Sequence, residues 1–322
     1  MISIGAGSSQ LIIGVRPSED MSRNEFLPGK RAFYKYASPD TALAILRSKT
    51  VRYSSPLSFN DPFDIQSGLH FDFDLSSLHA KVLDRIHQLA AAVDEPPVDK
   101  NDVWGKVVLA ARSYFPTHGF PRERWEQMSA PSFSEIIATI KDTQEQYQSH
   151  WRNVLLPGIR VFCVSEERDN LLMWAHYAQD HTGGVFEFWS LPEEDNPLSV
   201  ARRVDYVQSP PPFFTESEWL DDLLGIKKLD LHALYRRYAY AKSIHWSYER
   251  EWRVWYPLAD LRGQYDVMPI RPSEFRALYI GCKASPRFVE EATELMRSSF
   301  PSAMIFRAHK SETAYELQYT ET

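Results

Sequence analysis

Hydrophobic and polar positions along the chain predict strands towards both ends and helices in between. Strand-like runs occupy residues 32–36, 51–55, 160–165 and 185–189, and the run at 160–165 is continuously apolar from Val161 to Val164, as in a strand buried on both faces. Pro39 and Asp40 open a helical pattern that extends to about Arg47. From about 76 to 153 the spacing is helical, with prolines that we expect to break it. We therefore expect an α+β fold with a mixed sheet and a helical insertion at about 76–153.

The remaining patterns extend this arrangement to the end of the chain. We expect helices at 171–179, with Asp169 as cap, and at 216–243, and strands at 201–207 and 246–256. A β-α-β unit is predicted from 278–282, 286–299 and 303–307, with a last strand at 315–319. Residues 1–31 are interpreted as a mobile leader, and 32–322 as a single domain. No apolar run reaches 18 residues and no signal-length apolar segment follows the start, so we expect a cytoplasmic protein that enters no membrane.

Composition narrows the classes of function. The net charge is −7, which argues against a general coating of nucleic acid but leaves a local basic groove possible. Cys163 and Cys282 are the two cysteines, too few for a disulfide-stapled secreted domain, which favours a reducing compartment. Aromatic residues make up 13% of the chain, enough to fill a large core or to stack on a planar ligand.

The segment from Trp246 to Tyr256 is the most informative for chemistry. Because strand side chains alternate between faces, Glu249, Glu251 and Arg253 should share one face. Tyr248, Trp252, Val254 and Tyr256 should mainly share the other face and pack inward. A solvated strand with an ion pair is the alternative, and it is the usual role of such triplets.

Two further segments carry side chains that could meet this strand. On the short helix after residue 170, Trp174 lies in an apolar stripe, and His176 and Tyr177 lie on the adjoining face. His176 could be a base or a ligand, although we favour a packing residue. The loop around Asn60 and Asp61 has turn chemistry that could also hydrogen-bond a ribose or amide. We expect the three segments, 33–64, 161–188 and 242–256, to line one pocket.

The motifs together resemble a known bacterial family. They are Tyr34-Lys-Tyr36, Phe59-Asn-Asp-Pro-Phe63, Phe162-Cys-Val-Ser165, Met173-Trp-Ala-His-Tyr177 with Gly184, and Trp246-x-Tyr-Glu-x-Glu-Trp-Arg253. In this order, over roughly 32–282, they resemble the domain of unknown function 2971 family. That resemblance implies a fold more than an activity.

A second resemblance suggests a mechanism. The opening strand, helix and strand ending in Ser54 look like the start of ADP-ribosyltransferase-like domains, which include DNA-modifying toxins of bacterial toxin–antitoxin systems. The resemblance implies a split mixed sheet, NAD as substrate, Glu251 as catalytic carboxylate and Glu249 as its partner in a Glu-x-Glu form. The residues expected to hold NAD are Tyr34, Lys35, Tyr36, Ser54, Asn60, Asp61, Ser165, Trp174, His176, Tyr177 and Arg253. The resemblance also implies a macromolecular acceptor for the ADP-ribose, and a role in phage defence or as a toxin.

Two alternatives stay open at this point. A binding module of a defence system would hold a nucleotide or a protein without turnover. A metal-dependent nuclease or phosphoesterase would use Asp61, Asp64, Glu249 and Glu251 as oxygen ligands. Oligomeric state cannot be deduced from the pattern.

Overall fold

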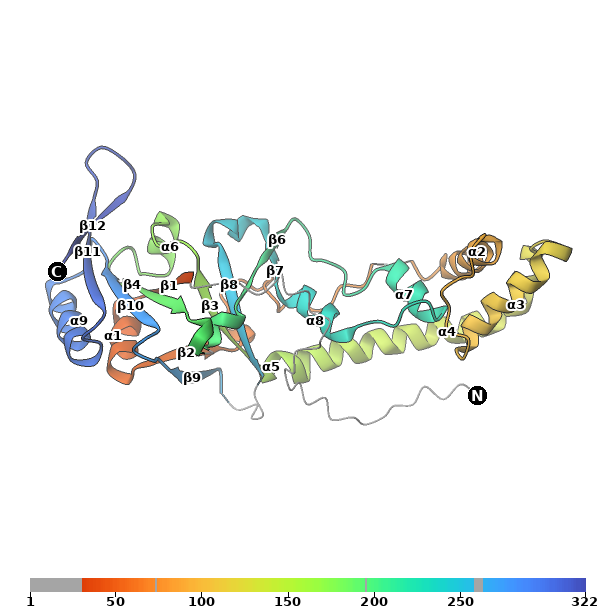
Figure 1. Ribbon diagram of the computed structural model, residues 1–322, viewed down its shortest axis with the longest axis horizontal. Coiled ribbons are helices and arrows are strands. Elements are labelled where there is room, and N and C mark those ends of the chain that lie inside the picture. The colour runs from red at the N-terminus through yellow and green to blue at the C-terminus, as the bar shows by residue number, and fades with distance from the viewer. Residues whose placement is uncertain (1–30, 73, 195, 258–262) are drawn as a thin grey trace. The chain divides into compact units, whose positions relative to one another are not determined.

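The computed structural model describes residues 31–72, 74–194, 196–257 and 263–322 (Figure 1). Contacts divide the chain into two compact units. The described part of unit 1 comprises residues up to Ser55, Gly158–Arg203 and Tyr248–Thr322, and unit 2 comprises Pro56–Pro157 and Val204–Ser247. The predicted insertion at 76–153 falls within unit 2, which also takes in the later stretch of chain. The predicted leader lies outside the described residues, except for Arg31.

Unit 1 is built on a mixed β-sheet, and the chain as a whole has the predicted α+β class. The strands lie in the order β12-β11-β10-β4-β1-β3-β2-β9, with β8 paired to β3 and β5 paired to β8. Strands β10 and β11 run parallel, whereas β1 is antiparallel to β4 and β3 to β8. Their bounds are β1 Arg31–Ala37, β2 Thr50–Ser54, β3 Ile159–Ser165, β4 Gly184–Ser190, β5 Arg202–Arg203, β8 Glu251–Pro257, β9 Tyr265–Pro269, β10 Phe275–Ile280, β11 Met304–Lys310 and β12 Leu317–Glu321.

The sheet forks at β3. One edge of this strand pairs with β8 along its whole length, from Ile159 to Ser165. The other edge meets β1 at the pair Tyr34–Ser165 and β2 at the pair Ser54–Val161. From there β1 continues along β4, and β2 continues along β9. The two arms of the sheet therefore diverge from the same strand.

Each face of the sheet has its own apolar cluster and its own helices. On one face Phe33, Phe162 and Trp252 pack with helices α1 (Pro39–Ser48) and α9 (Pro286–Ser299). On the other face Tyr36 and Tyr279 pack with α6 (Leu171–His176), which lies away from α1 and α9 in Figure 1. Burial on both sides explains why the 160–165 run is apolar.

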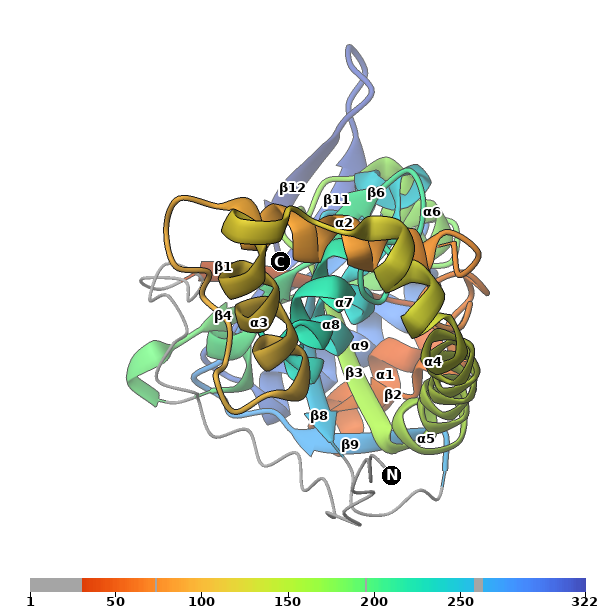
Figure 2. The ribbon, with the colours of Figure 1, turned by 90° about the vertical axis from the view of Figure 1, so that its right-hand side faces the viewer.

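Unit 2 has a separate core. Helices α2 (Leu78–Ala91), α3 (Val103–His118), α4 (Arg122–His150) and α7 (Glu216–Leu223) enclose it (Figure 2). Leu78, Val108 and Phe133 are among its buried side chains. Helix α4 continues into a π-helical stretch, Trp151–Leu155, and a short helix α5, Leu156–Gly158. Unit 2 also holds α8 (Leu231–Ala239) and the parallel pair β6 (Asp205–Val207) and β7 (Ala241–Ser243). None of the helices in the described residues is long and apolar enough to span a bilayer.

Several predicted boundaries were wrong, each for a local reason. Helix α6 is capped by the side chain of Asn170, not Asp169, and ends at His176. The breaks expected at 95–97 and 116–121 are present between α2, α3 and α4. Pro131, which was also expected to break the helical block, lies inside α4, where it removes one backbone donor without ending the helix. The predicted helix at 216–243 is two helices, separated at Gly225, whose φ is +70°. The predicted strand at 246–256 begins only at Glu251, after a 3-10 segment, Ile244–Glu249.

Candidate functional site

A single row of side chains crosses four strands of unit 1 where the two arms meet. Strand pairing places Glu187 of β4 beside Tyr34 of β1, Tyr34 beside Ser165 of β3, and Ser165 beside Glu251 of β8. Directly paired residues project from the same face of a sheet, and neighbouring strands lie about 4.8 Å apart. The row therefore brings two acidic residues, a phenol and a hydroxyl to one face. This is the face on which α6 packs.

Glu251 is held rigidly by Arg253. The Arg253 Nε lies 2.7 Å from Glu251 Oε1, and its Nη2 lies 3.0 Å from Oε2. Arg253 is fully buried and Glu251 is 5% exposed. Such a bidentate contact fixes the plane of the carboxylate. Glu251 and Arg253 thus share one face, as predicted. They form a buried ion pair there and not a solvated one.

Glu249 lies outside the strand yet close to the same row. Its side chain is buried, and the Tyr177 hydroxyl lies 2.5 Å from its Oε1. The Ser165 hydroxyl donates to the Glu249 carbonyl oxygen at 2.7 Å. Arg250, between the two glutamates, has a φ of +43°, a conformation that is uncommon for residues other than glycine. This local backbone turns the chain so that both carboxylates face the interior of unit 1.

The residues of the first motif have different environments. Tyr34 is half-buried, and its pKa is raised by burial and by the neighbouring Glu187 carboxylate. Tyr36 is buried and donates to the Glu167 carbonyl oxygen at 2.8 Å. Lys35 projects from the opposite face and donates to the Cys163 carbonyl oxygen at 2.9 Å. Tyr34 is therefore the member of this motif that lies in the row.

The site residues predicted in and just after α6 also have different environments. Trp174 is fully buried, and its indole nitrogen donates to the Arg168 carbonyl oxygen at 2.9 Å. His176 is exposed, with its ring centroid 6.3 Å from that of Tyr248. Tyr177, the next residue, supplies the contact with Glu249 described above. Ser54 lies on the face of the row, beside Val161 at the far end of β3.

Asn60 and Asp61 belong to unit 2 and so are described apart from the row. Asp61 accepts a hydrogen bond from the Phe63 backbone at 2.9 Å, which is the turn chemistry predicted for it. Asp64, in the same motif, lies 3.5 Å from the ammonium group of Lys242, and both side chains are almost fully buried. In the described residues no group of three His, Cys, Asp or Glu side chains is arranged to hold a metal ion.

Two features were missed from the sequence. Glu187 is buried and accepts hydrogen bonds from the Tyr279 hydroxyl and the Trp189 indole, both at 2.6 Å. The sequence signal was a lone acidic residue in the middle of an apolar strand, Gly184–Ser190, since such a residue needs partners when buried.

The second missed feature is a cluster of arginines around Glu166. Arg31, Arg203 and Arg250 all approach this carboxylate, the last two at 3.6 and 3.9 Å. Arg250 also lies 2.8 Å from Glu167. The three guanidinium groups outnumber the two carboxylates, so the cluster carries surplus positive charge. The three arginines are far apart in the sequence, and only the pairing of β1, β3, β5 and β8 brings them together.

A thiol on β3 lies beside the catalytic candidate. Cys163 is paired with Arg253 across β3 and β8. Burial, followed by the Glu251 carboxylate, raises the pKa of the Cys163 thiol well above its ordinary value. It is therefore a protonated packing group and not a thiolate nucleophile at neutral pH.

Comparison with known proteins gives one match. Residues 173–254 match the model of a family described as protein of unknown function (DUF2971). No curated protein and no solved structure matches the chain. The matched segment includes Tyr177, Glu249, Glu251 and Arg253, whereas Tyr34 and the 59–63 motif precede it. The expected resemblance to the DUF2971 family is therefore shown, on the evidence of residues 173–254.

Proposed function

We propose that unit 1 takes NAD as a substrate and catalyses ADP-ribosyl transfer or NAD hydrolysis, with Glu251 as the catalytic carboxylate. The observation that carries this proposal is the row Tyr34, Ser165, Glu251 at the fork of the sheet. It combines a carboxylate of fixed orientation with a hydroxyl and an aromatic ring. The resemblance to ADP-ribosyltransferase-like domains supports the same assignment.

The reaction needs a negative charge at a defined place. When the bond between nicotinamide and ribose breaks, nicotinamide leaves with the bonding electron pair and positive charge develops on the ribose. Glu251 would accept a hydrogen bond from a ribose hydroxyl and stabilise that charge. The acceptor oxygen or nitrogen then bonds to the ribose carbon and releases its proton. Arg253 keeps the Glu251 carboxylate oriented throughout, which makes it a positioning residue.

Other groups of unit 1 suit the remaining parts of NAD. Tyr34, Tyr177 and Tyr248 are only partly buried, and a planar nicotinamide ring can stack on such side chains. The guanidinium groups around Glu166 are exposed, but Arg31 packs over Trp252 and Arg203 pairs with it, so this cluster lies on the face of the sheet opposite the row and is not assigned to NAD. Arg253 is engaged with Glu251 and Lys35 with a backbone carbonyl, so neither is assigned to the pyrophosphate.

Binding and turnover can be tested separately. Thermal unfolding with and without NAD measures binding, and mass spectrometry of the recovered ligand measures turnover. We expect NAD to raise the midpoint temperature of thermal unfolding and to be recovered as nicotinamide and ADP-ribose products. Tyr34→Ala should remove most of the NAD-dependent shift, whereas Leu172→Ala, an exposed change on α6, should retain it. No NAD-dependent shift and no nicotinamide from the wild type would reject the proposal.

The second candidate is a binding module without turnover. The burial of Glu251 and Arg253 favours this candidate. A buried ion pair can hold a ligand or stabilise the fold without taking part in catalysis. Recovery of bound NAD unchanged after long incubation would establish this candidate. Under either candidate, a cytoplasmic role in bacterial defence or as a toxin, with a macromolecular acceptor in the catalytic case, follows from the resemblance.

A further inference from the structure

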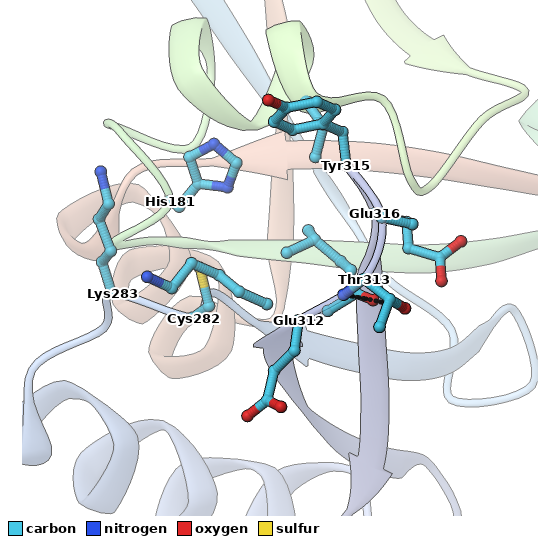
Figure 3. A pocket seen from close by; sticks show the side chains of 12 residues that line it. His181, Cys282, Lys283, Glu312, Thr313, Tyr315 and Glu316 are labelled. Carbon is cyan, nitrogen blue, oxygen red and sulfur yellow. Dashed lines mark hydrogen bonds between the residues drawn. The ribbon is translucent and has the colours of Figure 1, made fainter.

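A cavity lies beside the loop that connects β11 to β12, away from the row described above. Its volume is about 620 Å³, within the range of small-molecule sites. Its wall combines the loop residues 311–316 with Leu171 of α6, His181, and the Cys282–Lys283 segment (Figure 3). All of these belong to unit 1.

His181 presents a buried polar atom at this wall. Its Nδ1 has no hydrogen-bond partner among the described residues. The imidazole lies flat against Trp174, with ring centroids 6.0 Å apart and planes 4° from parallel. Burial and the nearby Lys283 charge lower the pKa of His181, so the ring is neutral at pH 7. A buried nitrogen without a partner is costly unless a ligand or water satisfies it.

The backbone that carries His181 is strained and firmly held. Gln179, Asp180 and His181 have φ values of +48°, +54° and +67°, three successive left-handed residues without a glycine. Each costs roughly 1–2 kcal/mol relative to ordinary backbone. The turn is fixed by the Lys283 backbone N–H, which donates to the His181 carbonyl oxygen at 3.0 Å. Gly281 allows this approach, because a Cβ there would lie 2.1 Å from the same oxygen. Strain of this kind commonly marks a binding site.

Charge and shape indicate what the cavity accepts. Lys283 and Lys310 both line it, and neither forms an ion pair in the described part of the chain. In Figure 3 the carboxylates of Glu312 and Glu316 point away from the imidazole, whereas Lys283 lies on the same side of the cavity as His181. Tyr315 is completely exposed and its ring borders the cavity, where it can stack on a planar group.

We propose that this cavity is a second site, which binds a nucleoside monophosphate. The phosphate is held by Lys283 and Lys310, the imidazole Nδ1 of His181 hydrogen-bonds to it, and the base stacks on Tyr315. Lysine ammonium groups suit a compact phosphate dianion. The site is independent of Glu251 and requires no turnover of its ligand.

Isothermal titration of the full chain with AMP and with adenosine tests the phosphate requirement. AMP should bind at least tenfold more tightly than adenosine. Lys283→Ala and Lys310→Ala should each weaken AMP binding by about tenfold or more, the usual effect of a lost hydrogen bond to a charged group. Lys227→Ala, the same change at an exposed position of unit 2, should leave the affinity unchanged.

A further comparison separates this site from the proposed NAD site. Glu251→Gln should retain AMP binding, and Lys283→Ala should retain nicotinamide release. The inference is overturned if AMP does not bind the wild type, if adenosine binds as tightly as AMP, or if Lys227→Ala weakens binding as much as Lys283→Ala. If the wild type binds AMP but does not turn over NAD, only the proposed function is overturned.

Discussion

The buried pair of Glu251 and Arg253 makes a sharp prediction about stability. Replacement of either residue by methionine leaves the other charge inside unit 1 without the two contacts of 2.7 and 3.0 Å. Removal of one member of a buried pair costs about 3–5 kcal/mol. Replacement of both by apolar side chains of similar volume is often nearly neutral. The double variant should therefore be at least as stable as either single variant.

A double-mutant cycle measures this coupling. Urea unfolding of the wild type, Glu251→Met, Arg253→Met and the double variant gives four free energies of unfolding. For a domain of 150–250 residues, the single variants should melt roughly 6–20 °C below the wild type. Hydrogen exchange at the amides of β3 and β8 provides a local readout, because unit 2 need not unfold with unit 1. Mutations at distant sites normally change the free energy of unfolding additively, to within about 0.5 kcal/mol.

Additivity would refute the reasoning. If the double variant lost the sum of the two single losses, the charges would contribute independently and the pair would not hold the Glu251 carboxylate. Met296→Ala is the control, because Met296 is fully buried on the opposite face, in α9. It should lower the free energy of unfolding by about 2–5 kcal/mol, and this loss should add to that of either single variant.

Three other predictions concern different parts of the chain. In unit 2, Lys242→Met leaves the Asp64 carboxylate buried and should cost about 3–5 kcal/mol by thermal unfolding; an effect as small as that of the exposed control Lys227→Met would contradict this. In unit 1, Cys163 should resist alkylation at pH 8, because burial raises its thiol pKa, while Cys282 reacts; peptide mapping that finds equal rates would contradict this. Because the folded chain keeps the Cys163 proton to higher pH, stability from this group should decline above pH 9.0.

The sequence predicted the parts of unit 1 that local chemistry determines. Pro39 and Asp40 mark the start of α1, and the apolar run of β3 marks a strand covered on both faces. The β-α-β unit of β10, α9 and β11 is confirmed, with its two strands parallel. Alternation along β8 correctly placed Trp252 and Val254 in the apolar cluster, opposite Glu251 and Arg253.

What the sequence left undetermined depends on contacts between distant segments. Tyr248 was expected on the face of Trp252, but the 3-10 segment and the positive φ of Arg250 turn it into the cluster with α6. Strand β9 was missed, because it is a short and largely exposed edge strand defined by its pairing with β2. The role of Glu187 in the row depends on the register between β1 and β4, which no local pattern encodes.

The most direct measurement is the rate of nicotinamide release from NAD by the wild type and by Glu251→Gln. Glutamine keeps one acceptor oxygen towards Arg253 while it removes the negative charge, and Met296→Ala controls for lower stability alone. The account predicts that Glu251→Gln releases nicotinamide about 10²–10³-fold more slowly, while the folded control keeps the wild-type rate. Equal rates for the wild type and Glu251→Gln would show that this carboxylate is not catalytic and would contradict the account.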